Sequence, residues 1–99
     1  MLFRSLAWAM LSDNSLDKAS QLYDTLLTST PAHEDYLNAG YCQWAMGNVQ
    51  RAVELFREWM VKSGKSTEQL LEEFRSDADT LEMYGISETD CFLMLSLVG

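Results

Sequence analysis

The chain has 99 residues, 47% of them hydrophobic, with five glycines and a single proline. That length and apolar content suit one folded domain and exclude a disordered chain. The net charge of −8 argues against nucleic acids and anionic membranes as partners, because both require a basic protein surface. No apolar run approaches the roughly 18 residues that a membrane-spanning helix needs.

The first third of the chain predicts two helices joined by a short turn. Apolar residues recur with helical spacing over residues 2–12 and again over residues 15–29. Between them, residues 13–15 read Asp-Asn-Ser, which favours a turn and a helix N-cap. Pro31 follows the second helix as a stop, because proline cannot continue a helix.

The middle third predicts a second pair of helices, over residues 33–46 and 49–63. Gly47 and Asn48 form the turn between them. Gly64 ends the pair, since glycine adopts the left-handed backbone of a helix C-cap at little cost.

The last third, residues 65–99, begins with a helix that is marked by its ends. Ser66 and Gln69 have the spacing of a capping box, which opens a helix at about residue 67. Its apolar stripe continues to about Tyr84, with a break expected near residues 76–77, and Gly85 stops it.

A second capping box, Ser87 with Asp90, precedes a last helix whose sequence, CFLMLSLV, is apolar on almost every side. Such a helix must be buried, either in this chain or against another one. The acids of this third of the chain outnumber its bases by eight to two, and we expect them to face water.

The chain matches itself when it is shifted by 33 residues. Residues of similar size and polarity then coincide: Phe3 with Tyr36, Ala7 with Gly40, Asn14 with Gly47, Ala19 with Ala52, Tyr23 with Phe56, and Leu27 with Met60. A period of 20 to 50 residues is typical of stacked repeats.

Two glycines within this repeat need different explanations. A glycine inside a helix costs roughly 1 kcal/mol relative to alanine, so it needs a reason to be there. Gly47 is explained by the turn. Gly40 lies in the middle of a predicted helix, and we expect it to let that helix approach the small Ala52 of the next one, with Phe56 filling the space beside the crossing.

These residues resemble the tetratricopeptide repeat, a helix-turn-helix unit of about 34 residues. The matching residues are Phe3, Leu6, Ala7, Ala19, Tyr23 and Pro31 in the first unit, and Tyr36, Ala39, Gly40, Gly47, Ala52 and Phe56 in the second. The first unit departs from the family pattern at Ala7, and the second at Trp59 and Gly64. Trp59 and Gly64 indicate that no regular third repeat follows.

The resemblance implies an all-α solenoid of antiparallel helix pairs, with about six helices in a single domain. Repeat 1 would span about residues 1–32 and repeat 2 about residues 33–64. Irregular capping helices would span about residues 65–99, since the terminal units of such stacks are usually atypical.

Residues that could carry catalysis are scarce, and we expect neither an enzyme nor a bound metal or cofactor. His33 is the only histidine, and neither cysteine lies near it in sequence to complete a zinc site. Cys42 and Cys91 lie among apolar residues, where we expect buried structural thiols. Two cysteines are too few for a disulfide framework, which favours the cytoplasm.

The expected function is therefore binding of a protein or peptide, as an adaptor or scaffold. In tetratricopeptide stacks, the first helix of each unit lines a concave groove that binds a partner's peptide or helix. Carried over to this chain, the groove would offer Arg4, Ser5, Trp8, Leu37, Asn38, Tyr41 and Trp44. Exposed tryptophan, tyrosine and arginine are typical of binding hot spots. Alternatively, the three aromatic residues of this set simply pack between helices.

Two further alternatives remain open from the sequence. The apolar last helix and Trp59 could pack on a second copy of the chain, which would make this a self-association module. The chain could also be a segment of a longer protein whose activity lies elsewhere.

Overall fold

The computed structural model describes residues 2–29 and 31–99, and for residues 2–5 it describes the backbone alone. This part of the chain is all-helical and contains no β-strand, which confirms the predicted all-α class. The helices are α1 (Leu2–Ser12), α2 (Leu16–Thr28), α3 (His33–Ala45), α4 (Val49–Ser63), α5 (Thr67–Ser76), α6 (Ala78–Met83) and α7 (Glu88–Val98). There are seven rather than about six, because the helix expected over residues 67–84 breaks at Asp77.

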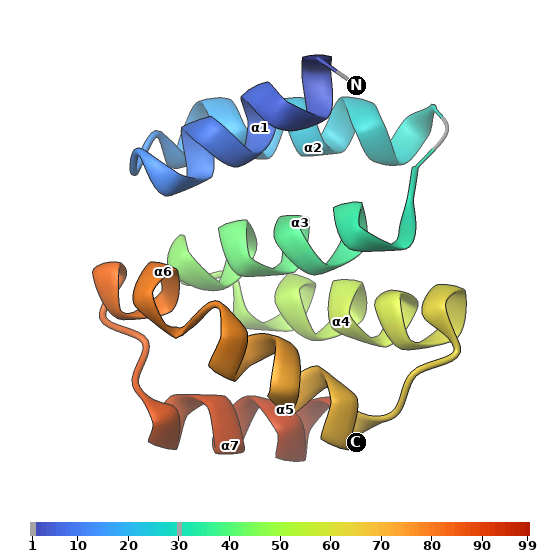
Figure 1. The fold of residues 1–99 in the computed structure, drawn as a ribbon, viewed down its shortest axis with the longest axis vertical. Helices are drawn as coiled ribbons and strands as arrows, with labels where there is room; N and C mark the ends of the chain where they lie inside the picture. The colour runs from blue at the N-terminus through green and yellow to red at the C-terminus, as the bar shows by residue number, and fades with distance from the viewer. Residues whose placement is uncertain (1, 30) are drawn as a thin grey trace.

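The helices form layers along the longest axis of the molecule (Figure 1). One end consists of α1 and α2, which pack on each other, and the middle layer consists of α3 and α4, which share the most extensive helix contact of the fold. The third layer consists of α5, α6 and α7: α7 forms the opposite end and packs against both α5 and α4, whereas α6 lies level with the middle layer. None of these helices, in the part of the chain described, is long and apolar enough to cross a membrane.

The turns within the first two layers repeat the same geometry 33 residues apart. Asn14 and Gly47 both adopt the left-handed conformation, with φ of 63° and 86°. In each turn the next residue's N–H donates back across it: Ser15 to the carbonyl of Met10 at 2.8 Å, and Asn48 to that of Gln43 at 2.8 Å. This is the six-to-one bond of a helix C-terminus. The periodicity seen in the sequence therefore corresponds to a repeated turn.

Gly40 makes a close contact, and its nearest neighbour is the Phe56 ring that the sequence predicts beside the crossing. A Cβ atom on Gly40 would lie 2.5 Å from Cε1 of Phe56, and its three nearest heavy atoms would all belong to that ring. The expected neighbour, Ala52, is fully buried but is not among those atoms. The glycine thus makes room for an aromatic ring.

The third layer begins each of its longer helices with a capping box, as predicted. The backbone N–H of Gln69 donates to Ser66 Oγ at 3.3 Å, and the N–H of Ser66 donates to Gln69 Oε1 at 3.0 Å. Ser87 and Asp90 repeat the arrangement at the start of α7. These reciprocal bonds satisfy backbone donors that the first helical turn leaves free.

Candidate protein-docking surfaces

The seven residues predicted to line a groove do not form one accessible surface. Leu37 and Tyr41 are buried, with exposed fractions of 6% and 0%. The side chains of Trp8, Asn38 and Trp44 are half-buried. Those of Arg4 and Ser5 lie outside the described residues. Leu37 and Tyr41 are therefore inaccessible to a partner, which corrects the expectation that they would be offered on the surface.

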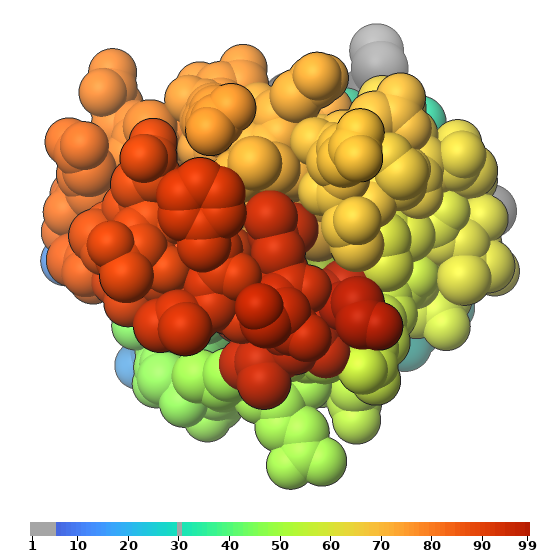
Figure 2. All heavy atoms as spheres, turned by 90° about the horizontal axis from the view of Figure 1, so that it is seen from below, coloured from blue at the N-terminus to red at the C-terminus, as the bar shows by residue number. Residues whose placement is uncertain are grey.

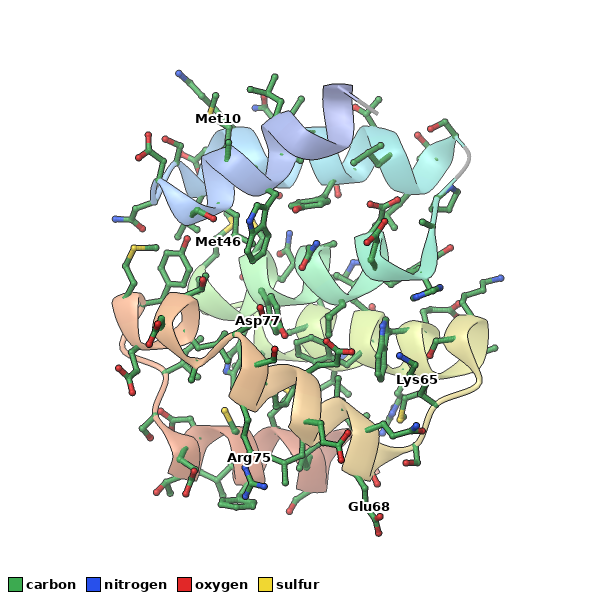
Figure 3. The ribbon with its side chains drawn as sticks, in the orientation of Figure 1. Met10, Met46, Lys65, Glu68, Arg75 and Asp77 are labelled. Atoms are coloured by element: carbon green, nitrogen blue, oxygen red, sulfur yellow. The ribbon has the colours of Figure 1, made fainter. Side chains whose placement is uncertain are left out.

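Tyr41 is covered by α5. Its hydroxyl donates to Asp77 Oδ2 at 2.7 Å, and its ring centroid lies 6.0 Å from that of Phe74. Burial raises the pKa of Tyr41 above its ordinary value, and the negative Asp77 raises it further. Asp77 itself stands at the junction between α5 and α6 (Figure 3). For Tyr41, the alternative of packing between helices is therefore the correct one.

We expect Tyr41→Phe to lower the free energy of unfolding by about 1–2 kcal/mol, because the Asp77 carboxylate loses a charge-assisted hydrogen bond. Urea denaturation followed by circular dichroism measures the change. Tyr36→Phe is the matched control, since Tyr36 lies on the same helix but is partly exposed, and it should change stability by less than about 0.5 kcal/mol. Equal effects of the two substitutions would contradict the assigned bond.

Trp44 also belongs largely to the interior. Its ring centroid lies 5.8 Å from that of Phe56 and 5.2 Å from that of Phe74. Phe56 and Phe74 are in turn 5.2 Å apart and fully buried. The four rings of Tyr41, Trp44, Phe56 and Phe74 form one aromatic cluster that joins α3, α4 and α5. Of the groove residues with described side chains, Trp8 and Asn38 remain outside this cluster and partly exposed.

The histidine and the two cysteines, which were the candidates for metal binding or redox chemistry, do not form a site among the described residues. His33 is exposed at the start of α3, and the described residues contain no group of three or more His, Cys, Asp or Glu that could hold a metal ion. Cys42 and Cys91 are free and buried, which confirms the expected buried thiols. The Cys42 thiol donates to the Leu16 carbonyl at 3.4 Å, and its burial raises its pKa to about 11.

Among the described helices, α7 carries the largest number of exposed large apolar side chains. Cys91, Met94 and Val98 point inward and are buried. Three other apolar side chains of this helix are exposed: Phe92 at 45%, Leu93 at 59% and Leu97 at 52%. The helix that the sequence requires to be buried is therefore buried on one side only.

Phe92, Leu93, Ser96 and Leu97 lie on one face of the helix, and we call these four residues the α7 strip. Residues four positions apart are neighbours on a helix surface, so Phe92 lies next to Ser96 and Leu93 lies next to Leu97. In the view onto the end of the molecule, α7 lies across the front between α5 and α4 (Figure 2). The other exposed large apolar residues, such as Val61, are distributed over α1, α4, α6 and the turn between α3 and α4.

Arg57 holds the C-terminal end of the α7 strip in place. Its guanidinium donates from Nε to the Val98 carbonyl at 3.0 Å and from Nη2 to the Leu97 carbonyl at 2.9 Å. These carbonyls are among those that a helix end leaves without a partner, and a positive charge there is favourable. The strip is therefore a fixed part of the fold at this end.

A comparison with models of protein families, with curated proteins and with solved structures finds no significant match to this chain. The case for a function therefore rests on the surfaces described above. Sequence reasoning identified CFLMLSLV as a segment that needs a partner, but it could not tell which side of that helix the fold would cover.

Proposed function

We propose that this protein is a tetratricopeptide-like helical repeat module that binds other proteins and has no catalytic role of its own. The proposal is supported by the two helix pairs α1–α2 and α3–α4, whose turns recur after 33 residues with a left-handed residue at the same position and the same backbone bond. It is also supported by the small residues that these pairs bury, Ala7, Ala19, Gly40 and Ala52. Two free, buried thiols suit a reducing compartment such as the cytoplasm.

The observation that carries the binding function is the exposure of the α7 strip at the end of the layered stack. The end units of repeat stacks normally present a polar outer face, because no neighbour covers them. Here the outer face holds three large apolar side chains, each about half exposed. Covering them would contribute on the order of 1 kcal/mol each. We assign the strip as the docking surface of the module.

A second candidate surface is what remains of the predicted groove. Trp8 on α1 and Asn38 on α3 are both partly exposed, and tryptophan is enriched in binding hot spots. This candidate is smaller than the one first expected, because Leu37 and Tyr41 do not contribute surface to it.

Affinity capture with matched variants tests the assignment. Leu93→Glu places a charge in the α7 strip, whereas Val61→Glu makes the same change at an apolar residue of α4 that is 74% exposed. We expect a bound protein to be lost with Leu93→Glu and retained with both Val61→Glu and Trp8→Ala. Retention by Leu93→Glu together with loss by Trp8→Ala would overturn the assignment and favour the groove.

A further inference from the structure

The α7 strip is bordered by opposite charges on the neighbouring helix α5. Arg75, near the C-terminus of α5, and Glu68, near its N-terminus, both extend toward the end of the molecule that carries α7 (Figure 3). Both side chains are exposed. They are seven residues apart, which is two helical turns or about 10 Å along α5.

Neither charge is neutralised within the described part of the chain. The ion pairs there join Arg51 with Glu54 and Lys65 with Glu73, and neither includes Glu68 or Arg75. A positive and a negative side chain thus lie seven residues apart on the helix beside the apolar strip, with the exposed Glu72 between them. Such a surface is complementary to the same surface of a second copy whose helices run in the opposite direction.

The strip itself is also complementary in size when two copies run antiparallel. An antiparallel pairing centred between residues 94 and 95 places Phe92 against Leu97 of the second copy. It also places the large Leu93 against the small Ser96 of the second copy. The pairing of Leu93 with Ser96 lets the centre of the two helix surfaces interlock, and the pairing of Phe92 with Leu97 supplies apolar contact on either side. The same rotation brings Arg75 toward Glu68 of the second copy, and Glu68 toward Arg75 of the second copy.

We infer that the occupant of the α7 strip is a second copy of this chain, docked antiparallel about a two-fold axis. The inference rests on the proposed function and names its partner. The apolar strip supplies the centre of the interface, and the two Arg75–Glu68 pairs at its edge fix the antiparallel orientation.

The expected dimer is a weak one. One helix face with its two flanking charges falls below the roughly 1,200 Å² of total buried surface that characterises stable interfaces. Each copy also carries a net charge of −8, which opposes association. We therefore expect monomer and dimer to exchange, with the dimer favoured at high protein concentration.

Sedimentation velocity of the full chain over a wide range of concentrations tests the inference. We expect a sedimentation coefficient that rises with concentration from that of a monomer to that of a dimer. Leu93→Glu should raise the dissociation constant more than about tenfold, because the dimer would bury unpaired charges. Val61→Glu should leave the constant within about twofold of the wild-type value, and circular dichroism should show the same helix content in all three proteins.

Charge reversal tests the orientation. Glu68→Arg lowers the negative charge of each copy, so general repulsion alone would make it strengthen the dimer. We expect Glu68→Arg to weaken the dimer instead, because the new positive side chain would lie opposite the positive Arg75 of the second copy. Asp24→Arg, which makes the same change on α2 in the layer at the opposite end of the molecule, should not weaken it. The double reversal Glu68→Arg/Arg75→Glu should restore association.

Three results would overturn the inference: a monomer at every concentration, a dimer that Leu93→Glu leaves intact, or a double reversal that stays as weak as the single one. A monomeric protein that still loses a captured partner with Leu93→Glu would leave the proposed function standing while this inference fails. A monomeric protein whose capture is insensitive to Leu93→Glu would remove both.

Discussion

Phe74→Ala is expected to lower the free energy of unfolding by about 3–5 kcal/mol, which is typical of truncating a buried phenylalanine. Phe74 is fully buried, and its ring lies 5.2 Å from Phe56 and from Trp44 and 6.0 Å from Tyr41. It is the contribution of α5 to the aromatic cluster. Removing it leaves a cavity between the third layer and the middle one.

The loss is large against the whole stability of a chain this size, which is of order 5–15 kcal/mol. Urea denaturation monitored by circular dichroism and by tryptophan fluorescence measures it. Phe92→Ala is the matched control, because it removes the same side chain from an exposed site on α7 and should cost less than about 1 kcal/mol. Comparable losses for the two variants would contradict the described packing of α5.

Gly40→Ala is expected to destabilise the protein by about 1–3 kcal/mol, although alanine is the better helix former. The new Cβ would lie 2.5 to 2.9 Å from three ring atoms of Phe56. That ring is fully buried and is held by Tyr41 and Trp44, at centroid distances of 5.9 and 5.8 Å, so it has little room to move. The steric cost should therefore exceed the gain of roughly 1 kcal/mol in helix propensity.

A double-mutant cycle with Phe56→Leu separates the steric cost of Gly40→Ala from its gain in helix propensity. In the smaller-side-chain background the clash should be relieved, and Gly40→Ala should become neutral or stabilising. Chemical denaturation of the four proteins gives the coupling energy. If Gly40→Ala stabilised the wild-type background, the close approach of Phe56 to α3 would be refuted.

The first two layers could be predicted from sequence because local signals agree there. The helix periodicity, the left-handed turn at Gly47 and its counterpart Asn14 mark the same boundaries. The special role of Gly40 was also recognisable, since a mid-helix glycine needs a close contact. How closely the Phe56 ring approaches Gly40 was not, because that distance depends on the relative rotation of α3 and α4.

The third layer and the surfaces were less predictable because they depend on contacts between distant residues. Tyr41 reads as a groove residue in sequence, yet it is buried through a bond to Asp77, 36 positions later. The helix break at Asp77 could be anticipated, but not its bond to Tyr41. On α7, seven of the eight residues 91–98 are apolar, and they carry no periodicity that would distinguish the inner side from the outer one.

The most direct test of the central claim is a series of ¹H–¹⁵N spectra of the protein recorded from dilute to concentrated solution, because this measurement locates the docking surface residue by residue. We predict concentration-dependent shifts or broadening at Phe92, Leu93, Ser96 and Leu97, and none at Trp8 or Asn38. Changes confined to Trp8 and Asn38, or spectra that do not change with concentration, would contradict the assignment of the α7 strip as a surface for a second copy.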